Sequence, residues 1–163
     1  MTTHEMVERI TNLGRSGTRA LEFAAPAVDL LLRLWVANVF FKSGLTKIAN
    51  FDSTIALFEN EYMVPLLSPE VAACLGTGAE LVLPVFLALG LGTRLSALAL
   101  FMFNIFAVIS YPDLSPAGLN EHIFWGVLLL VTIVHGGGKL AVDRWIGWLW
   151  PQNASHCRAE WAR

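Results

Sequence analysis

Apolar residues gather in four stretches of this chain, and shorter segments with proline, glycine or charge separate them. The stretches cover residues 26–48, 69–91, 95–111 and 121–135. A helix rises about 1.5 Å per residue, so about 20 apolar residues cross the hydrocarbon core of a bilayer. The pattern predicts an all-α fold, a polytopic membrane bundle of four helices.

The residues at the borders of these stretches indicate where the helices begin and end. Pro26 suits the first turn of a helix, and Ser-Pro-Glu at 68–70 reads as an N-cap followed by a first-turn proline and acid. Two residues separate the second stretch from Arg94, which predicts a tight helical hairpin. The fourth stretch is short for a bilayer, and a buried helix that does not span is the alternative for it. We favour a span, because it puts the basic ends on one side.

With four spans, most of the positive charge lies on the side that holds both chain ends and the turn between the second and third helices. Eight of the 11 Lys and Arg residues are there: Arg9, Arg15, Arg19, Arg94, Lys139, Arg144, Arg158 and Arg163. Positive charge is retained in the cytoplasm, so we expect both termini to be cytoplasmic.

The chain is long enough for one domain. We expect a cytoplasmic N-terminal arm at 1–25, the transmembrane bundle at 26–138 and a cytoplasmic tail at 139–163. The arm fits a helix lying on the membrane surface about as well as a solvated tail. We expect the first span not to be a cleaved signal peptide, because its charged leader is long and Arg33 and Lys42 interrupt it.

Composition agrees with a membrane protein. The 163 residues are 55% hydrophobic and 15% charged, against about 25% charged in a soluble domain, and the mean hydropathy is +0.57. The net charge of −2 gives no sign of a nucleic-acid partner. Cys74 and Cys157 form no CxxC pair and predict no disulfide framework.

Three strongly polar residues, Arg33, Glu80 and Asn104, interrupt the apolar stretches. Each costs about 2.5–3.5 kcal/mol at membrane depth on insertion scales, so such a residue usually faces a partner or a cavity. Counted from the cytoplasmic ends, Glu80 and Asn104 lie about 15 Å deep and Arg33 about 10 Å. One interpretation is a buried Arg33–Glu80 ion pair, with Asn104 hydrogen-bonding between helices. The other is a site for a polar head group or a proton relay.

A second group of candidates lies toward the opposite mouth of the bundle. Lys47 follows Arg33 by nearly four helical turns and shares its face, while His122 and Trp125 lie one turn apart at the start of the fourth span. The ordinary interpretation is a snorkelling lysine and an aromatic belt; the alternative is a head-group site. We expect no haem or metal site, since His122 and His135 lie about 20 Å apart along the helix on nearly opposite faces. A quinone is a better candidate than haem, because it needs only an apolar cleft with one or two hydrogen-bonding groups.

Three motifs occur in a fixed order. The first consists of Arg33, Phe40, Gly44 and Lys47. The second consists of Glu80, Gly90 and Arg94. The third is GGGKLAVD at 136–143. Their order resembles the DoxX family of small bacterial membrane proteins, with its first-helix pattern R…F…G..K and closing turn G-x-G-[RK]-x-S-x-D. Ala141 stands where serine is common. The resemblance covers roughly residues 28–145.

The resemblance implies a four-helix bundle in the bacterial inner membrane, of the kind shared with the small subunit of thiosulfate:quinone oxidoreductase. One hypothesis is a redox-associated subunit that holds a quinone or another lipid-soluble ligand. Glu80 and Arg33 would form its inner polar pair, and Lys47 and His122 its outer gate. The alternative is a non-catalytic scaffold that docks a soluble partner on its basic cytoplasmic face. No catalytic residue is assigned, and whether the chain is an enzyme or a homo-oligomer stays open.

Overall fold

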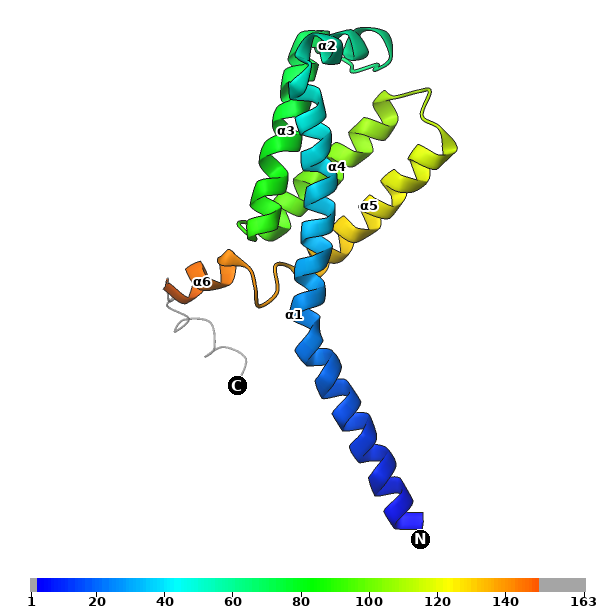
Figure 1. Cartoon of the computed structure of the whole chain (residues 1–163), viewed down its shortest axis with the longest axis vertical. Helices are drawn as coiled ribbons and strands as arrows, with labels where there is room; N and C mark the ends of the chain where they lie inside the picture. Colours follow the sequence, from blue (N-terminus) through cyan, green and yellow to red (C-terminus); the bar gives the residue numbers. More distant parts are fainter. Residues whose placement is uncertain (1–2, 150–163) are drawn as a thin grey trace, which may run out of the picture.

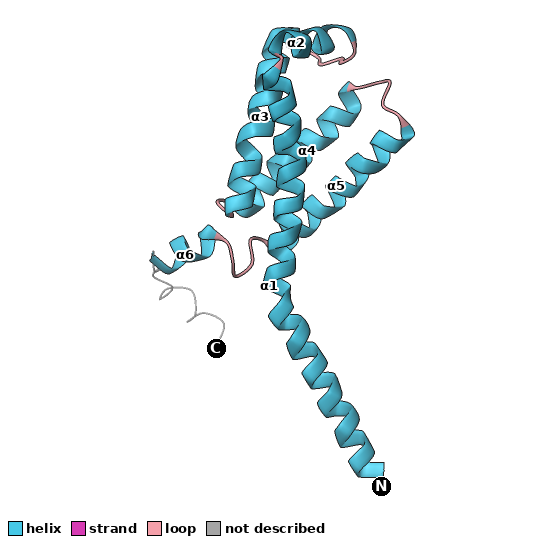
Figure 2. Ribbon diagram, viewed as in Figure 1, coloured by secondary structure: helices cyan, strands magenta, loops and turns pink. Residues whose placement is uncertain are grey.

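The computed structural model describes residues 3–149 of the chain. Within that range the chain is helical and has no strand, as Figures 1 and 2 show. The helices are α1 (Thr3–Ala49), α2 (Phe51–Asn60), α3 (Pro69–Leu89), α4 (Thr93–Ser110), α5 (Pro116–His135) and α6 (Val142–Leu149). Four of them, namely α3, α4, α5 and the Gly17–Ala49 part of α1, are long and apolar enough to span a membrane. The predicted all-α membrane bundle is confirmed.

The four long helices pack around a small apolar core. Helix α1 lies against α3 and α5, and α4 lies against α3 and α5. Val36, Ala37 and Phe40 of α1 meet residues of the other three helices in this core: Leu87, Ala97, Leu100 and Leu129. Many large apolar side chains on the outer faces are exposed, as a lipid environment requires.

Helix α1 runs without interruption through Pro26, so the predicted start of the first helix at that proline is wrong. Ala24 and Ala25 precede the proline, and neither side chain can accept a hydrogen bond as an N-cap residue does. The helix has 47 residues and is therefore about 70 Å long, more than twice the thickness of the hydrocarbon core. Its N-terminal part projects well beyond the bundle (Figure 1).

Helix α5 begins at Pro116, five residues before the predicted start at Glu121. Ser115 caps it, and its hydroxyl accepts a hydrogen bond from the amide of Gly118 at 3.1 Å. Ser68 and Pro69 begin α3 in the same way. The extension gives α5 20 residues, enough by length and composition for a span.

Helix α2 and the loop 61–68 cover one end of the bundle, and α6 lies near the other end (Figure 1). The loop is fixed to α4, because the amide of Met63 donates a hydrogen bond to the carbonyl oxygen of Ser110 at 2.7 Å. We refer to these as the α2 end and the α6 end.

Candidate functional site

The six candidate residues from the sequence separate into three places. Lys47 and Glu80 meet between α1 and α3 toward the α2 end. Asn104, His122 and Trp125 form a group between α4 and α5. Arg33 lies apart from both, at the α6 end.

Lys47 and Glu80 form a nearly buried ion pair. The Lys47 Nζ lies 2.6 Å from each carboxylate oxygen of Glu80 and 3.2 Å from the hydroxyl oxygen of Ser43. The side chains are 14% and 6% exposed, respectively. Gly44 permits this approach of α1 to α3, because a Cβ there would lie only 2.9 Å from Leu81 Cγ.

The predicted Arg33–Glu80 pair is therefore wrong. Arg33 packs against Gly90, ten residues and about 15 Å along α3 from Glu80. The prediction measured depth from the start of the first apolar stretch at Pro26, whereas α1 continues far past the bundle. Arg33 lies level with the end of α3. Its Nη2 donates a hydrogen bond to the carbonyl oxygen of Leu140 at 3.1 Å. The residue is 1% exposed and serves to join α1 to the loop before α6.

Asn104 connects α4 to α5, as the interhelical interpretation predicted. Its Nδ2 donates a hydrogen bond to the carbonyl oxygen of His122 at 2.9 Å, and its Oδ1 lies 2.7 Å from His122 Nδ1. Because Oδ1 only accepts, the proton of a neutral His122 ring is on Nδ1. Trp125 lies edge-on to His122 and to Phe40, with ring centroids 4.8 and 5.9 Å apart, which ties this group to the core.

A cavity of about 400 Å³ lies beside the Lys47–Glu80 pair, between the loop 61–68, α2, α3 and α4. Its walls include four aromatic side chains: Phe58, Tyr62, Phe103 and Phe106. Lys47 and Glu80 are the charged groups among its described lining residues. These aromatic residues could not be predicted from the sequence, since they come from three separate segments and share no motif.

Tyr62 is held in place by stacking between two other rings. Its ring centroid lies 4.6 Å from that of Phe58 and 5.1 Å from that of Tyr111. The Tyr111 hydroxyl in turn donates a hydrogen bond to Glu61 at 2.8 Å. Burial and the negative charge of Glu80 raise the pKa of Tyr62 above its usual range, so its hydroxyl stays protonated at neutral pH.

The cavity opens to the side of the bundle. Leu75 of α3 and Phe106 of α4 both line it, yet they are 60% and 64% exposed on the apolar outer surface. In a membrane this surface faces lipid, so a molecule dissolved in the bilayer can reach the cavity laterally.

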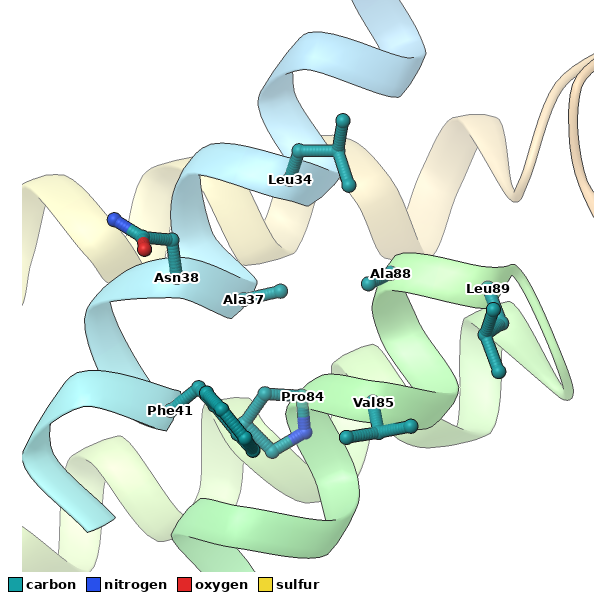
Figure 3. Close-up of a pocket in the computed structure, with 8 residues that line it drawn as sticks. All are labelled: Leu34, Ala37, Asn38, Phe41, Pro84, Val85, Ala88 and Leu89. Carbon is teal, nitrogen blue, oxygen red and sulfur yellow. The ribbon is translucent and has the colours of Figure 1, made fainter. Parts of the chain in front are cut away.

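A second groove, of about 270 Å³, lies between α1 and α3 and is almost entirely apolar. Figure 3 shows Leu34, Ala37 and Phe41 of α1 facing Pro84 of α3 and its neighbours, with the carboxamide of Asn38 directed away from α3. With no polar group aimed into it, this groove offers no chemistry beyond contact with a lipid chain.

At the α6 end, Asp143 caps the N-terminus of α4 across the α3–α4 turn. Its carboxylate accepts hydrogen bonds from the amides of Gly92 and Thr93 at 2.7 and 2.8 Å and from the Thr93 hydroxyl at 2.9 Å. Desolvation acts to raise the pKa of Asp143, but these hydrogen bonds and the charge of Arg33 outweigh it and lower the pKa below its usual range. Asp143, the last residue of the closing motif at 136–143, therefore has a structural role, and its partners Gly92 and Thr93 could not be recognised from the motif alone.

Within the described residues no group of three or more His, Cys, Asp or Glu side chains is arranged to hold a metal ion. Cys74 is exposed on α3, and Cys157 lies outside the residues that the structure describes.

Comparison with known proteins gives one family and one relative. Residues 28–112 match the sequence model of a family named DoxX, and this segment contains Arg33, Lys47, Glu80 and Asn104. A protein of Haemophilus influenzae, named only as uncharacterized, is 32% identical over 133 residues, covering 77% of this chain and 87% of the relative. No solved structure matches the chain.

Proposed function

Because this chain belongs to the DoxX family and is an integral membrane protein, we propose that it binds a quinone-like, lipid-soluble molecule as a redox-associated subunit. The observation that carries the proposal is the cavity at the Lys47–Glu80 pair, which combines aromatic walls, a charged floor and a lateral opening.

The dimensions and lining of the cavity suit a single ring. Its volume of about 400 Å³ falls in the range of small-molecule sites, which are typically about 300–1,000 Å³ and mostly apolar with a few polar groups. Phe58, Phe103 and Phe106 offer faces and edges against which a planar ring packs favourably. Lys47, Glu80 and the Tyr62 hydroxyl supply the polar groups that orient it.

The lateral opening favours a ligand that arrives from the bilayer. A quinone carries its ring on a long apolar tail, and a tail can remain among the lipid chains beside Leu75 and Phe106 while the ring occupies the cavity. A water-soluble ligand would have to cross the hydrocarbon region to reach this opening.

The proposal places the protein in the bacterial inner membrane with both termini in the cytoplasm. Exposed Arg94, Lys139 and Arg144 all lie at the α6 end, and positive charge favours the cytoplasmic side. The cavity, toward the α2 end, then lies near the outer surface of the membrane.

A scaffold that docks a soluble partner is the second candidate function. It is favoured by the length of α1, whose N-terminal part extends beyond the bundle (Figure 1) and carries the exposed residues Arg15 and Arg19.

Mass spectrometry of organic extracts from gently purified protein tests the first function. We expect about one quinone per chain in the wild type, and its loss in Ala79→Phe, which fills the cavity. The matched control is Ala56→Phe, because Ala56 is exposed on α2 outside the cavity lining. Wild-type protein that is empty after purification from quinone-containing membranes contradicts the proposal and favours the scaffold.

A further inference from the structure

The hydrogen-bonding groups at the floor of the cavity point to one redox state of the ligand. Resting on the proposed function, we infer that the cavity binds the reduced, hydroxyl-bearing ring, a hydroquinone, more tightly than the oxidised quinone, whose ring oxygens only accept hydrogen bonds.

The ammonium group of Lys47 already has acceptors within the protein. A lysine ammonium has three donors and no acceptor. The Lys47 Nζ has three acceptors within reach, the two carboxylate oxygens of Glu80 at 2.6 Å and the hydroxyl oxygen of Ser43 at 3.2 Å. The carbonyl oxygen of a quinone would therefore compete with these acceptors, two of which share a negative charge, for an N–H of Lys47.

Glu80, by contrast, retains capacity to accept. An ionised carboxylate has about four lone-pair positions, and Lys47 takes one on each oxygen. A hydroquinone O–H can donate to one of the remaining positions, and such a hydrogen bond to a charged group is stronger than one between neutral groups. A quinone would instead put its carbonyl oxygen against the carboxylate oxygens, acceptor against acceptor, in a site where water is scarce.

The other polar groups of the cavity do not reverse this preference. Tyr62 and Ser110 each contribute a hydroxyl, which can donate to a quinone or accept from a hydroquinone. Among the described lining residues the charged groups are Lys47 and Glu80, so the ion pair decides between the two redox states.

The experiment measures both redox states on the same wild-type protein in nanodiscs. The probes are a decyl-substituted benzoquinone and its anaerobically prepared hydroquinone, and equilibrium dialysis at pH 7 gives the two dissociation constants. We expect the hydroquinone to bind about tenfold tighter. For a two-electron couple this raises the reduction potential of the bound ligand by about 30 mV, which redox titration measures independently.

The outcomes separate the two proposals. If neither form binds, the proposed function fails. If both bind equally, or the quinone binds tighter, the function stands and the inference about the redox state is overturned.

Ser43→Ala tests the cause of the preference with little risk to folding. It removes one acceptor of Lys47 and frees an N–H for a quinone carbonyl, so we expect the preference to fall to about threefold or less. Thr46→Ala is the matched control, because the exposed Thr46 hydroxyl bonds only the carbonyl oxygen of Lys42. An unchanged preference in Ser43→Ala would overturn the inference that the acceptors around Lys47 set it.

Discussion

Lys47 and Glu80 are 33 positions apart in the chain, and their side chains join α1 to α3 with the Lys47 Nζ 2.6 Å from both carboxylate oxygens. Each of these charges would be costly to bury alone in a membrane bundle. As a pair, they neutralise one another and leave a polar floor beneath a cavity whose other walls are mostly apolar.

Breaking this pair on one side leaves a buried charge without its partner. We expect Lys47→Met and Glu80→Met each to lower the free energy of unfolding by about 3 kcal/mol. The double variant should recover most of that loss, since neither charge remains. Denaturant titrations in detergent micelles, followed by circular dichroism, give the three values. Losses that simply add in the double variant would show that the two residues act independently.

Gly90 provides a test of close packing at the α6 end. Its φ of +74° is unfavourable for other residues, and a Cβ there would collide with Arg33 Nη1 and lie 2.6 Å from the Cβ of Ala141. Gly90→Ala should therefore cost at least about 2 kcal/mol of unfolding free energy. Gly78→Ala, in the interior of α3, is the control: nothing lies within 4 Å of a Cβ placed there, so it should be neutral or slightly stabilising. Equal stability of the two variants would contradict the packing described here.

Asp143 makes the stability of the bundle depend on pH in the acidic range. Because folding lowers its pKa, the carboxylate stabilises the protein fully above its unfolded pKa of about 4 and loses that contribution as the pH falls through the folded value. Thermal unfolding between pH 7 and pH 3 should show this loss. Asp143→Ala should lower stability by about 1 kcal/mol at pH 7, as removal of a helix cap does. In that variant the loss of stability between pH 7 and pH 3 should be smaller than in the wild type. A loss of unchanged size would show that groups other than Asp143 cause it.

Asn104 is expected to affect stability but not ligand binding. Its two contacts with His122 join α4 to α5, and interhelical hydrogen bonds in membranes contribute about 0.6–1.7 kcal/mol. Asn104→Leu should lower the free energy of unfolding by about 1 kcal/mol. Its quinone content should match that of the wild type, since Asn104 does not line the cavity. A loss of quinone at unchanged stability would put Asn104 in the ligand site.

The elements of the fold could be predicted from sequence because each depends on neighbouring residues. Apolar runs and the Ser-Pro signal at Ser68 locate most of the helices, and the short α3–α4 turn follows from spacing alone. The partner of Glu80 could not be predicted in this way. It depends on the register of α1 against α3, which Gly44 and the continuation of α1 through Pro26 determine in three dimensions.

The candidate site was predictable only in part, for the same reason. Polar residues in apolar stretches pointed to Glu80 and Asn104, because the cost of burying them is visible in sequence. The aromatic walls of the cavity and the helix cap at Asp143 could not be recognised from the sequence. Phe58, Tyr62 and Phe103 lie in unrelated segments, and Asp143 acts on a turn some 50 residues before it.

The separation between Asp143 and Thr93 also sets an order of assembly. The carboxylate that closes the α3–α4 turn is made only after α5 has been completed. Synthesis proceeds at about 5–20 residues per second, so Asp143 is added several seconds after the α3–α4 turn has been made. Through that interval the amides of Gly92 and Thr93 depend on water or lipid head groups, so a residue of α6, made after all four spans, completes the turn between the second and the third of them.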